Sequence, residues 1–338
     1  MSWDKILGHE QIVSQFRQRL ARGKLGSSFL FIGPAGIGKR TLAHELARGL
    51  LCDRGGINSL DACDICPACQ QTSAGSHPDL ELISKPPDKS YIPIDLLIGD
   101  REHRMSDGLC YRISMKPYGG LRKVAIIDDA DHLNIEGANC LLKTLEEPPP
   151  RSVLILIGTS QQKQLPTIRS RCQIIRFQPL SNGHVAQLLL DKEIVNDTAK
   201  ASEVSRDAKG SLATAIELLD ESLLEFRQFF LSQLTEVDQL AHTLGKEVTD
   251  FVAQAGKEAS ARRNRLRQVV GFATEYFRQK VRHECDAGKT SNLRAIELWT
   301  DCIDRCVDTE SQIHNNANQA TLVDCWLDDL LTLQRSSL

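Results

Sequence analysis

A glycine-rich segment near the N-terminus restricts the possible folds more than any other part of the chain. Residues 33–41 read GPAGIGKRT; the apolar run SSFLFI comes directly before them, and RTLAHELARGLL continues from them with leucines four residues apart. A buried strand, a glycine loop and an amphipathic helix in this order predict a unit in which backbone N–H groups and the positive helix end face an anion. The alternative interpretation is a glycine-rich turn with no ligand.

This loop carries most of a nucleotide-binding consensus. The pattern G-x-x-x-x-G-K-[S/T] is matched by Gly33, Gly38 and Lys39, and Gly36 lies between them. In this pattern the lysine reaches the outer phosphates, and the next residue provides the hydroxyl that holds Mg²⁺. Arg40 stands in place of that hydroxyl, so the motif is incomplete at its metal-binding position.

An acidic pair provides a second part of a candidate nucleotide site. Asp128 and Asp129 come directly after the apolar run KVAII. In nucleotide hydrolases the first acid of such a pair holds the Mg²⁺ shell, and the second, usually a glutamate, orients the attacking water. Asp129 is one methylene shorter than that glutamate. The alternative interpretation is a solvated acidic strand end.

The apolar patterns divide the chain into an α/β part and a helical part. Three runs are continuously apolar (SSFLFI, KVAII and SVLILI), helical patterns separate them, and CQIIRFQPL is typical of a last strand. Continuous apolar strands between helices indicate a parallel sheet covered on both faces. After Pro179 only helical patterns follow, and ATLVDCWLDDLLTL places its large apolar side chains on one stripe. We therefore predict an α/β domain over 1–179, a small helical domain over 180–223 and a larger helical domain over 224–338.

Four cysteines have the spacing of a metal site. They follow the pattern C-x10-C-x2-C-x2-C within a module of about residues 52–70 and are Cys52, Cys63, Cys66 and Cys69. Four thiolates at this spacing suit a tetrahedral Cys₄ zinc site, and a closed four-thiolate shell is structural rather than catalytic. The alternatives are a redox pair or separate buried thiols.

The composition excludes several classes of protein. A net charge of −3 argues against a molecule that is basic overall and binds nucleic acid through that charge. No apolar run approaches the ~20 residues that span a bilayer, and the start MSWDKILGHEQ lacks the pattern of a signal segment. We expect a soluble cytoplasmic protein, in which the eleven cysteines favour metal ligation or burial over disulfides. Cys302 and Cys306 are expected in a core, and no role is predicted for Cys110 and Cys140.

Two groups of arginines are further candidates for a functional contact. The segment LPTIRSRC contains Arg169 and Arg171 just before the predicted last strand, where an exposed arginine is by default an ordinary surface residue. A second group spreads around a predicted helix in ARRNRLRQ, which favours a solvated face over a contact with DNA or a partner. Its members are Arg262, Arg263, Arg265 and Arg267.

Together these segments resemble, through nearly the whole chain, the bacterial clamp-loader branch of the AAA+ proteins. ILGHEQIVSQFRQRLARGKLGSSFLFIGPAGIGKRTLA is similar to the family's opening, LLKTLEEPPP to its LEEPP segment, and NANQATLVDCWLDDLL to its closing helix. The cysteine module lies where the family carries its zinc module. LIGTS contains Thr159 at the place of the residue that senses the end phosphate of the nucleotide, and SRC, which contains Arg171, is the family's signature tripeptide.

The resemblance implies a fold and a set of partners. The family fold is a RecA-like α/β domain with an inserted zinc module, a three-helix lid and an all-α collar. Five such subunits form an open ring, held together by the collars, that loads the sliding clamp onto primed DNA for the DNA polymerase III holoenzyme. The expected partners are therefore other clamp-loader subunits and, through the complex, the clamp and primed DNA, with no membrane.

Three departures from the family pattern affect the ATP site. Arg40 replaces the hydroxyl, and Thr41 does not restore it because one helical step turns a side chain by about 100°. Asp129 replaces the usual glutamate, and the phosphate-sensing arginine of the lid falls on Ala213. Because metal and charge stabilisation carry nearly all of phosphoryl-transfer catalysis, we predict no ATP hydrolysis. Binding of ATP and Mg²⁺ is left open.

Arg171, in contrast, is retained, and in the family this arginine reaches into the ATP site of the neighbouring subunit. The resemblance therefore implies a stationary subunit, or stator, that has no ATPase chemistry of its own but acts in trans within a polymerase holoenzyme. The alternatives are an active clamp-loader motor with ATPase activity and a free-standing DNA-binding protein with a zinc module.

Overall fold

The computed structural model describes residues 3, 6–55, 59–87, 89–104, 106–119, 122–235, 241–256, 258–286, 293–314 and 317–335. It divides into two compact units, Met1–Leu219 and Asp220–Leu338, which are described separately below. Within the described residues, no helix combines the length and the apolar character needed to cross a membrane.

The first unit is built on a parallel sheet with the strand order β2-β3-β4-β1-β5. The strands are β1 (Ser28–Ile32), β2 (Leu80–Ile83), β3 (Lys123–Ile127), β4 (Ser152–Gly158) and β5 (Gln173–Arg176). Four of them coincide with runs recognised in the sequence. The fifth, β2, was missed because it has only four residues and two of them are not buried, so an edge strand of this kind leaves little apolar signal.

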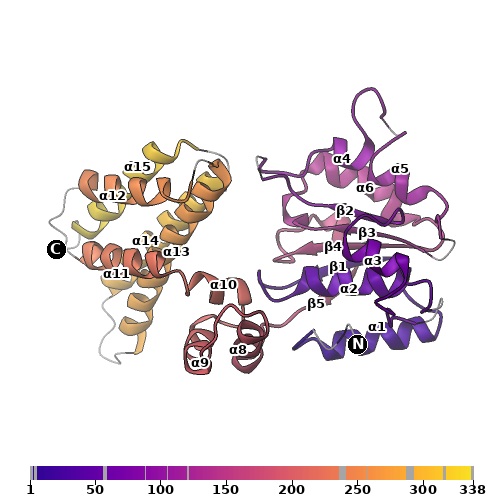
Figure 1. The fold of residues 1–338 in the computed structure, drawn as a ribbon. Helices are drawn as coiled ribbons and strands as arrows, with labels where there is room; N and C mark the ends of the chain where they lie inside the picture. Colours follow the sequence, from indigo (N-terminus) through magenta and orange to yellow (C-terminus); the bar gives the residue numbers. More distant parts are fainter. Residues whose placement is uncertain are drawn as a thin grey trace. The chain divides into compact units, whose positions relative to one another are not determined.

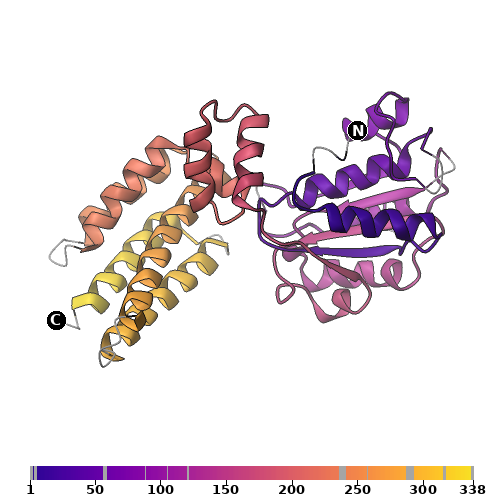
Figure 2. The same cartoon turned by 90° about the horizontal axis from the view of Figure 1, so that it is seen from below.

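Helices cover both faces of this sheet (Figures 1 and 2). On one face lie α1 (Glu10–Ala21) and α2 (Lys39–Leu51); on the other lie α4 (Asp95–Ile98), α5 (Leu109–Ser114) and α6 (Ile135–Glu146). Successive residues of β1 serve the two faces in turn: Phe29 and Phe31 belong to the core with α1 and α2, and Leu30 and Ile32 to the core with α4, α5 and α6. This two-sided burial explains why the strands are continuously apolar.

Shorter elements complete the first unit. They are α3 (Pro67–Ser73), the 3₁₀ turn η2 (Ala130–His132), α7 (Pro166–Arg169), α8 (Asn182–Asp191), α9 (Thr198–Asp207) and α10 (Leu212–Glu217). Helices α8, α9 and α10 each begin at a capping side chain, Ser181, Asp197 and Ser211 respectively. The units divide between residues 219 and 220, and α11 begins at Glu221. The three-part division at 179 and 223 stays a prediction.

The second unit is helical in all of its described elements. These are α11 (Glu221–Thr235), α12 (Ala241–Ala253), α13 (Ala259–Asp286), α14 (Leu293–His314) and α15 (Gln319–Arg335). The predicted apolar stripe of α15 is fully buried and consists of Val323, Trp326, Leu327, Leu330 and Leu331. Cys302 and Cys306 lie in the same core, as expected from their spacing.

Candidate functional site

The glycine-rich loop connects β1 with α2, as the sequence predicts. Gly36 and Gly38 have φ angles of +72° and +96°, which residues with a side chain rarely adopt. Gly33 is required for packing, because a Cβ atom there would lie 2.6 Å from the carbonyl oxygen of Phe177. The loop thus needs its glycines for conformation at two positions and for close approach at a third.

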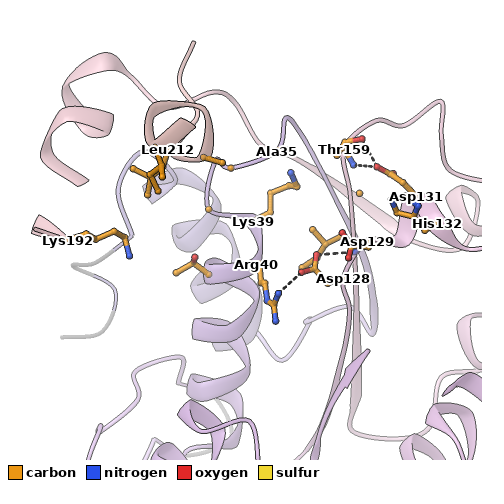
Figure 3. A pocket seen from close by; sticks show the side chains of 17 residues that line it. Ala35, Lys39, Arg40, Asp128, Asp129, Asp131, His132, Thr159, Lys192 and Leu212 are labelled. Atoms are coloured by element: carbon orange, nitrogen blue, oxygen red, sulfur yellow. Dashed lines mark hydrogen bonds and ion pairs between the residues drawn. The ribbon is translucent and has the colours of Figure 1, made fainter. Parts of the chain in front are cut away.

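A pocket of about 440 Å³ lies beside this loop, at the carboxyl ends of β3 and β4 (Figure 3). Its lining includes every predicted nucleotide-site residue except Gly33, namely Gly36, Gly38, Lys39, Asp128, Asp129 and Thr159. The helical segment that follows the sheet contributes Lys192, Leu212 and Ala213. The volume lies within the range of small-molecule binding sites.

Lys39 is held at the base of the pocket. Its Nζ donates hydrogen bonds to the carbonyl oxygens of Gly33 (2.6 Å) and Pro34 (2.5 Å), and the residue is only 6% exposed. Burial lowers the pKa of Lys39, and the charges of Asp131 and Asp128 oppose that shift. An ammonium group has three N–H donors, so one of them is left for an anion in the pocket.

Arg40 forms an ion pair with the acid that would hold the metal shell. Nη1 of Arg40 lies 3.3 Å from Oδ2 of Asp128, while Oδ1 of Asp128 accepts the backbone N–H of Asp129 (3.0 Å). Burial and the charge of Asp129 raise the pKa of the Asp128 carboxyl, and Arg40 opposes this shift. The cation that faces Asp128 is therefore a guanidinium group (Figure 3).

A third acid, Asp131, was not singled out from the sequence. Its Oδ2 accepts hydrogen bonds from the backbone N–H (2.8 Å) and the hydroxyl of Thr159, and its Oδ1 accepts one from the side chain of Gln164. Asp131 lies in η2 and Thr159 follows β4, so this acid joins the ends of two adjacent strands. Only the cluster DDAD at residues 128–131 signals it in the sequence.

The start of α10 rests on the glycine loop. The backbone N–H of Leu212 donates to the carbonyl oxygen of Gly36 (3.0 Å). A Cβ atom at Gly36 would lie 2.4 Å from Oγ of Ser211 and 2.6 Å from Cβ of Ala213. The resemblance implies a phosphate-sensing arginine at residue 213. Ala213 instead places a methyl group against the loop.

The four predicted metal ligands come together near the end of α2 and the start of α3. All four Sγ atoms lie within 4.8 Å of one another, and those of Cys52 and Cys66 are 4.0 Å apart. Tetrahedral zinc with Zn–S bonds of about 2.3 Å requires sulfur atoms about 3.8 Å apart. The backbone N–H groups of Cys63 and Cys69 point at Sγ of Cys52 and Cys66, respectively, as suits thiolate ligands.

Two thiols of this cluster have shifted pKa values, in opposite directions. Hydrogen bonds from the backbone of Ile65 and Cys66 lower the pKa of Cys63 to about 6, whereas burial raises the pKa of the Cys69 thiol. Several thiolates in one partly buried cluster need a positive charge among them. The cluster therefore fits a metal ion, and its geometry confirms the predicted group of four cysteines.

Arg171 lies outside the lining of the pocket. Its Nε donates to Oε1 of Glu146 (2.7 Å), and Nη2 forms an ion pair with the same oxygen. Its Nη1 donates to the carbonyl oxygen of Thr167 (2.9 Å) and to the hydroxyl of Ser170 (3.2 Å). The guanidinium is thus oriented by the last residue of α6 and by α7, with 30% of the side chain exposed.

A family model described as "DNA polymerase III, delta subunit" matches residues 8–181. The chain belongs to this family. The resemblance inferred from the motifs is thereby confirmed, and within it the DNA polymerase III delta-prime subunit is the member that the motifs resemble most. The architecture predicted from the sequence is also confirmed. It combines a RecA-like AAA+ sheet between two helical layers with a cysteine cluster and a helical second unit.

Curated relatives in this family bear related names. DNA polymerase III subunit delta' of Pseudomonas aeruginosa is 35% identical over 207 residues, which cover 61% of this chain and 60% of the relative. The subunit delta' of Bacillus subtilis is 32% identical over 199 residues, 56% of each protein. Subunit tau of Salmonella typhimurium is 30% identical over 222 residues, 64% of this chain and 32% of tau. The chain thus matches about three fifths of the first relative's length and about a third of tau.

Solved structures add little to this family assignment. A DNA polymerase III gamma subunit-related protein of Thermotoga maritima covers 95% of this chain and 98% of its own, with 15% identity and a TM-score of 0.41. The RuvB branch-migration motor of the same organism covers 84% of this chain and 78% of its own, with 14% identity and a TM-score of 0.41. At these TM-scores the likeness supports no conclusion.

The arginines of α13 correct one expectation. A solvated face was predicted, yet all four are partly buried. Arg265 forms an ion pair with Asp220 (3.2 Å), and its guanidinium lies 4.8 Å from the ring centre of Phe251. The helix start therefore packs within the second unit, which the spread of charges around a helix does not reveal.

Proposed function

We propose that this chain is a delta-prime-like stator of the clamp loader that serves the DNA polymerase III holoenzyme. In this proposal it joins other clamp-loader subunits in a pentameric ring that loads the sliding clamp onto primed DNA. The observation that carries the proposal is the family match over residues 8–181, together with the two delta' relatives. Residues 1–179 then form the AAA+ domain, 180–223 the lid and 224–338 the collar that holds the ring.

The ATP site of the chain itself does not hydrolyse ATP in this proposal. The ion pair of Arg40 with Asp128 supports it, because a side-chain cation faces the acid that would hold the Mg²⁺ shell. The methyl group of Ala213 supports it as well, because it brings no charge to the pocket. Phosphoryl transfer depends on metal and charge stabilisation, and both are reduced here.

Arg171 acts in trans, on the ATP site of a neighbouring subunit. The support is its place in the SRC tripeptide and its position outside the pocket of its own chain. Glu146 and the carbonyl of Thr167 hold the guanidinium in one orientation, so little side-chain entropy is lost when an anion approaches. An arginine supplied to a phosphoryl-transfer site contributes about 10³–10⁵ in rate in well-studied GTPases.

The four-cysteine cluster binds one structural zinc ion. Two observations support this choice of metal. The sulfur atoms have the spacing that zinc requires, and cysteine is the only ligand type in the cluster among the described residues. Four protein ligands leave no open coordination position, so the ion stabilises the segment between α2 and α3 and does not take part in chemistry.

Mixing the purified chain with the other subunits of a bacterial clamp loader tests the proposal. We expect one copy of the chain in a defined complex by native mass spectrometry, and no ATP hydrolysis by the chain alone. Steady hydrolysis that is lost in Lys39→Ala would instead indicate a motor subunit. Failure to assemble, with salt-sensitive DNA binding by the isolated chain, would indicate a free-standing DNA-binding protein.

A further inference from the structure

The pocket does not fit the Mg²⁺ ion that the fold family implies. Each carboxylate oxygen of Asp128 already faces a donor, Arg40 on one side and the backbone N–H of Asp129 on the other. The residue that should offer a hydroxyl ligand is itself a cation. A divalent ion placed beside Asp128 would therefore meet the positive charge of Arg40 at close range.

The oxygens of the next acid are also occupied. Asp131 accepts hydrogen bonds from Thr159 on one oxygen and from Gln164 on the other. These bonds hold the ends of adjacent strands together, so a metal ion at Asp131 would compete with them. The pocket is therefore unsuited to Mg²⁺ at Asp131 as well as at residue 40.

The same pocket retains the means to hold phosphate. Three cationic side chains line it, Lys39, Arg40 and Lys192, opposite three carboxylates. Arg40 is well placed to contact a ligand because 62% of its side chain is exposed, although Nη1 faces Asp128. A guanidinium group presents a planar fork of donors that matches phosphate oxygens, and the loop adds backbone N–H groups and the start of α2.

We infer that Arg40 replaces the divalent cation, so that this pocket binds a polyphosphate chain without Mg²⁺. The inference rests on the proposed function, in which the site does not hydrolyse ATP, and names the ligand class and the ionic condition for that site. The ligand chemistry is a chain of phosphates, supplied either by a nucleoside triphosphate or by inorganic polyphosphate. Excess Mg²⁺ weakens binding, because it competes for the phosphates and is repelled by Arg40.

Calorimetric titration of the full chain tests this directly. The probes are ATP and inorganic tripolyphosphate, each with EDTA and with excess Mg²⁺. We expect binding in EDTA and severalfold weaker binding in Mg²⁺. Tighter binding of ATP than of tripolyphosphate assigns the site to a nucleotide, and equal binding assigns it to the phosphate chain alone. Binding that requires Mg²⁺, or no binding of either probe in EDTA, overturns the inference.

Arg40→Thr and a matched control measure the contribution of Arg40 to binding. Arg40→Thr should bind the probes about tenfold more weakly in EDTA, as for loss of one hydrogen bond from a charged donor, and should bind more tightly when Mg²⁺ is added. The matched control Arg206→Thr changes an exposed arginine of α9 that does not line the pocket, and should leave both wild-type affinities unchanged. Equal weakening in the two variants would show that Arg40 makes no specific contact with the probes and would contradict the inference.

The result of these binding experiments is independent of the test of the proposed function. Binding is measured on the isolated chain, whereas the stator role is judged by assembly and by the absence of turnover. A chain that assembles and does not hydrolyse ATP, yet binds only the Mg²⁺ complex of ATP, would refute the inference and leave the proposed function intact. Thermal melting of each variant verifies that it is folded.

Discussion

At position 40 a single side chain decides which cation faces Asp128. A hydroxyl there would leave the carboxylate to a metal ion, whereas the guanidinium of Arg40 lies 3.3 Å from it. The pocket is otherwise well formed, with Lys39 buried and glycines at the two positions of positive φ in the loop. One residue therefore changes which cation Asp128 faces, while the fold of the loop is kept.

The cysteine cluster leads to a testable prediction at the residue scale. Cys66→Ser should lower the zinc content from about one ion per chain, because one of four sulfur ligands is lost. The side chain at residue 66 also caps α3 by accepting the N–H of Cys69, and a serine hydroxyl can still do so. This short helix should therefore loosen locally because the metal is lost, while the sheet stays folded. Metal analysis and hydrogen exchange of purified protein measure both effects.

Cys325→Ser is the matched control, because Cys325 is exposed and lies in α15, outside the cluster. It should retain full zinc content. If carefully reduced wild-type protein contains no zinc, or if Cys66→Ser retains as much as the control, the metal assignment is wrong.

Among the elements, the contact of α10 with the glycine loop is the most sensitive to substitution. Gly36→Ala should destabilise the protein by about 2–4 kcal/mol, because a left-handed φ of +72° costs about 1 kcal/mol and the added methyl group meets Ser211 and Ala213. Urea unfolding monitored by circular dichroism gives the change in free energy of unfolding.

Gly23→Ala separates the two costs. Gly23 also has a positive φ of +66°, but a Cβ atom there would have nothing within 4 Å. This variant should therefore lose only about 1 kcal/mol, the part due to backbone conformation. Equal losses in the two variants would show that α10 does not press on the loop in solution.

The elements that could be predicted from the sequence are those whose residue pattern lies within a short segment of the chain. Strands β1, β3 and β4 are buried on both faces, so their apolar runs are unbroken, whereas the short edge strand β2 was missed. The cysteine cluster was found because three of its ligands lie within seven residues of sequence. The bonds of Asp131 to Thr159 and the contact of Leu212 with Gly36 join residues 28 and 176 positions apart, and no local pattern encodes such pairs.

At the scale of the whole molecule, two compact units divide the tasks of the proposed function. The first holds the pocket, the cysteine cluster and Arg171, and the second is an all-helical unit around Phe230, Phe277 and Trp326 among its described residues. A stator needs both: a helical unit for assembly and an α/β unit that presents Arg171 to a neighbour. The family match ends at residue 181, so the proposed collar role of the second unit is tested by assembly experiments.

Arg171→Ala in the assembled clamp loader tests the central claim most directly. Assembly and zinc content should match wild type, as in the control Arg176→Ala, which changes an exposed arginine at the end of β5. ATP hydrolysis stimulated by clamp and primed DNA should fall severalfold, and less than the ~10³–10⁵ seen in GTPases, because only one site of the ring faces this subunit. Arg171→Lys should be almost as impaired, since lysine lacks the planar fork. A wild-type rate of hydrolysis in Arg171→Ala, with assembly confirmed, would contradict the account. Arg171 would then be an ordinary surface residue.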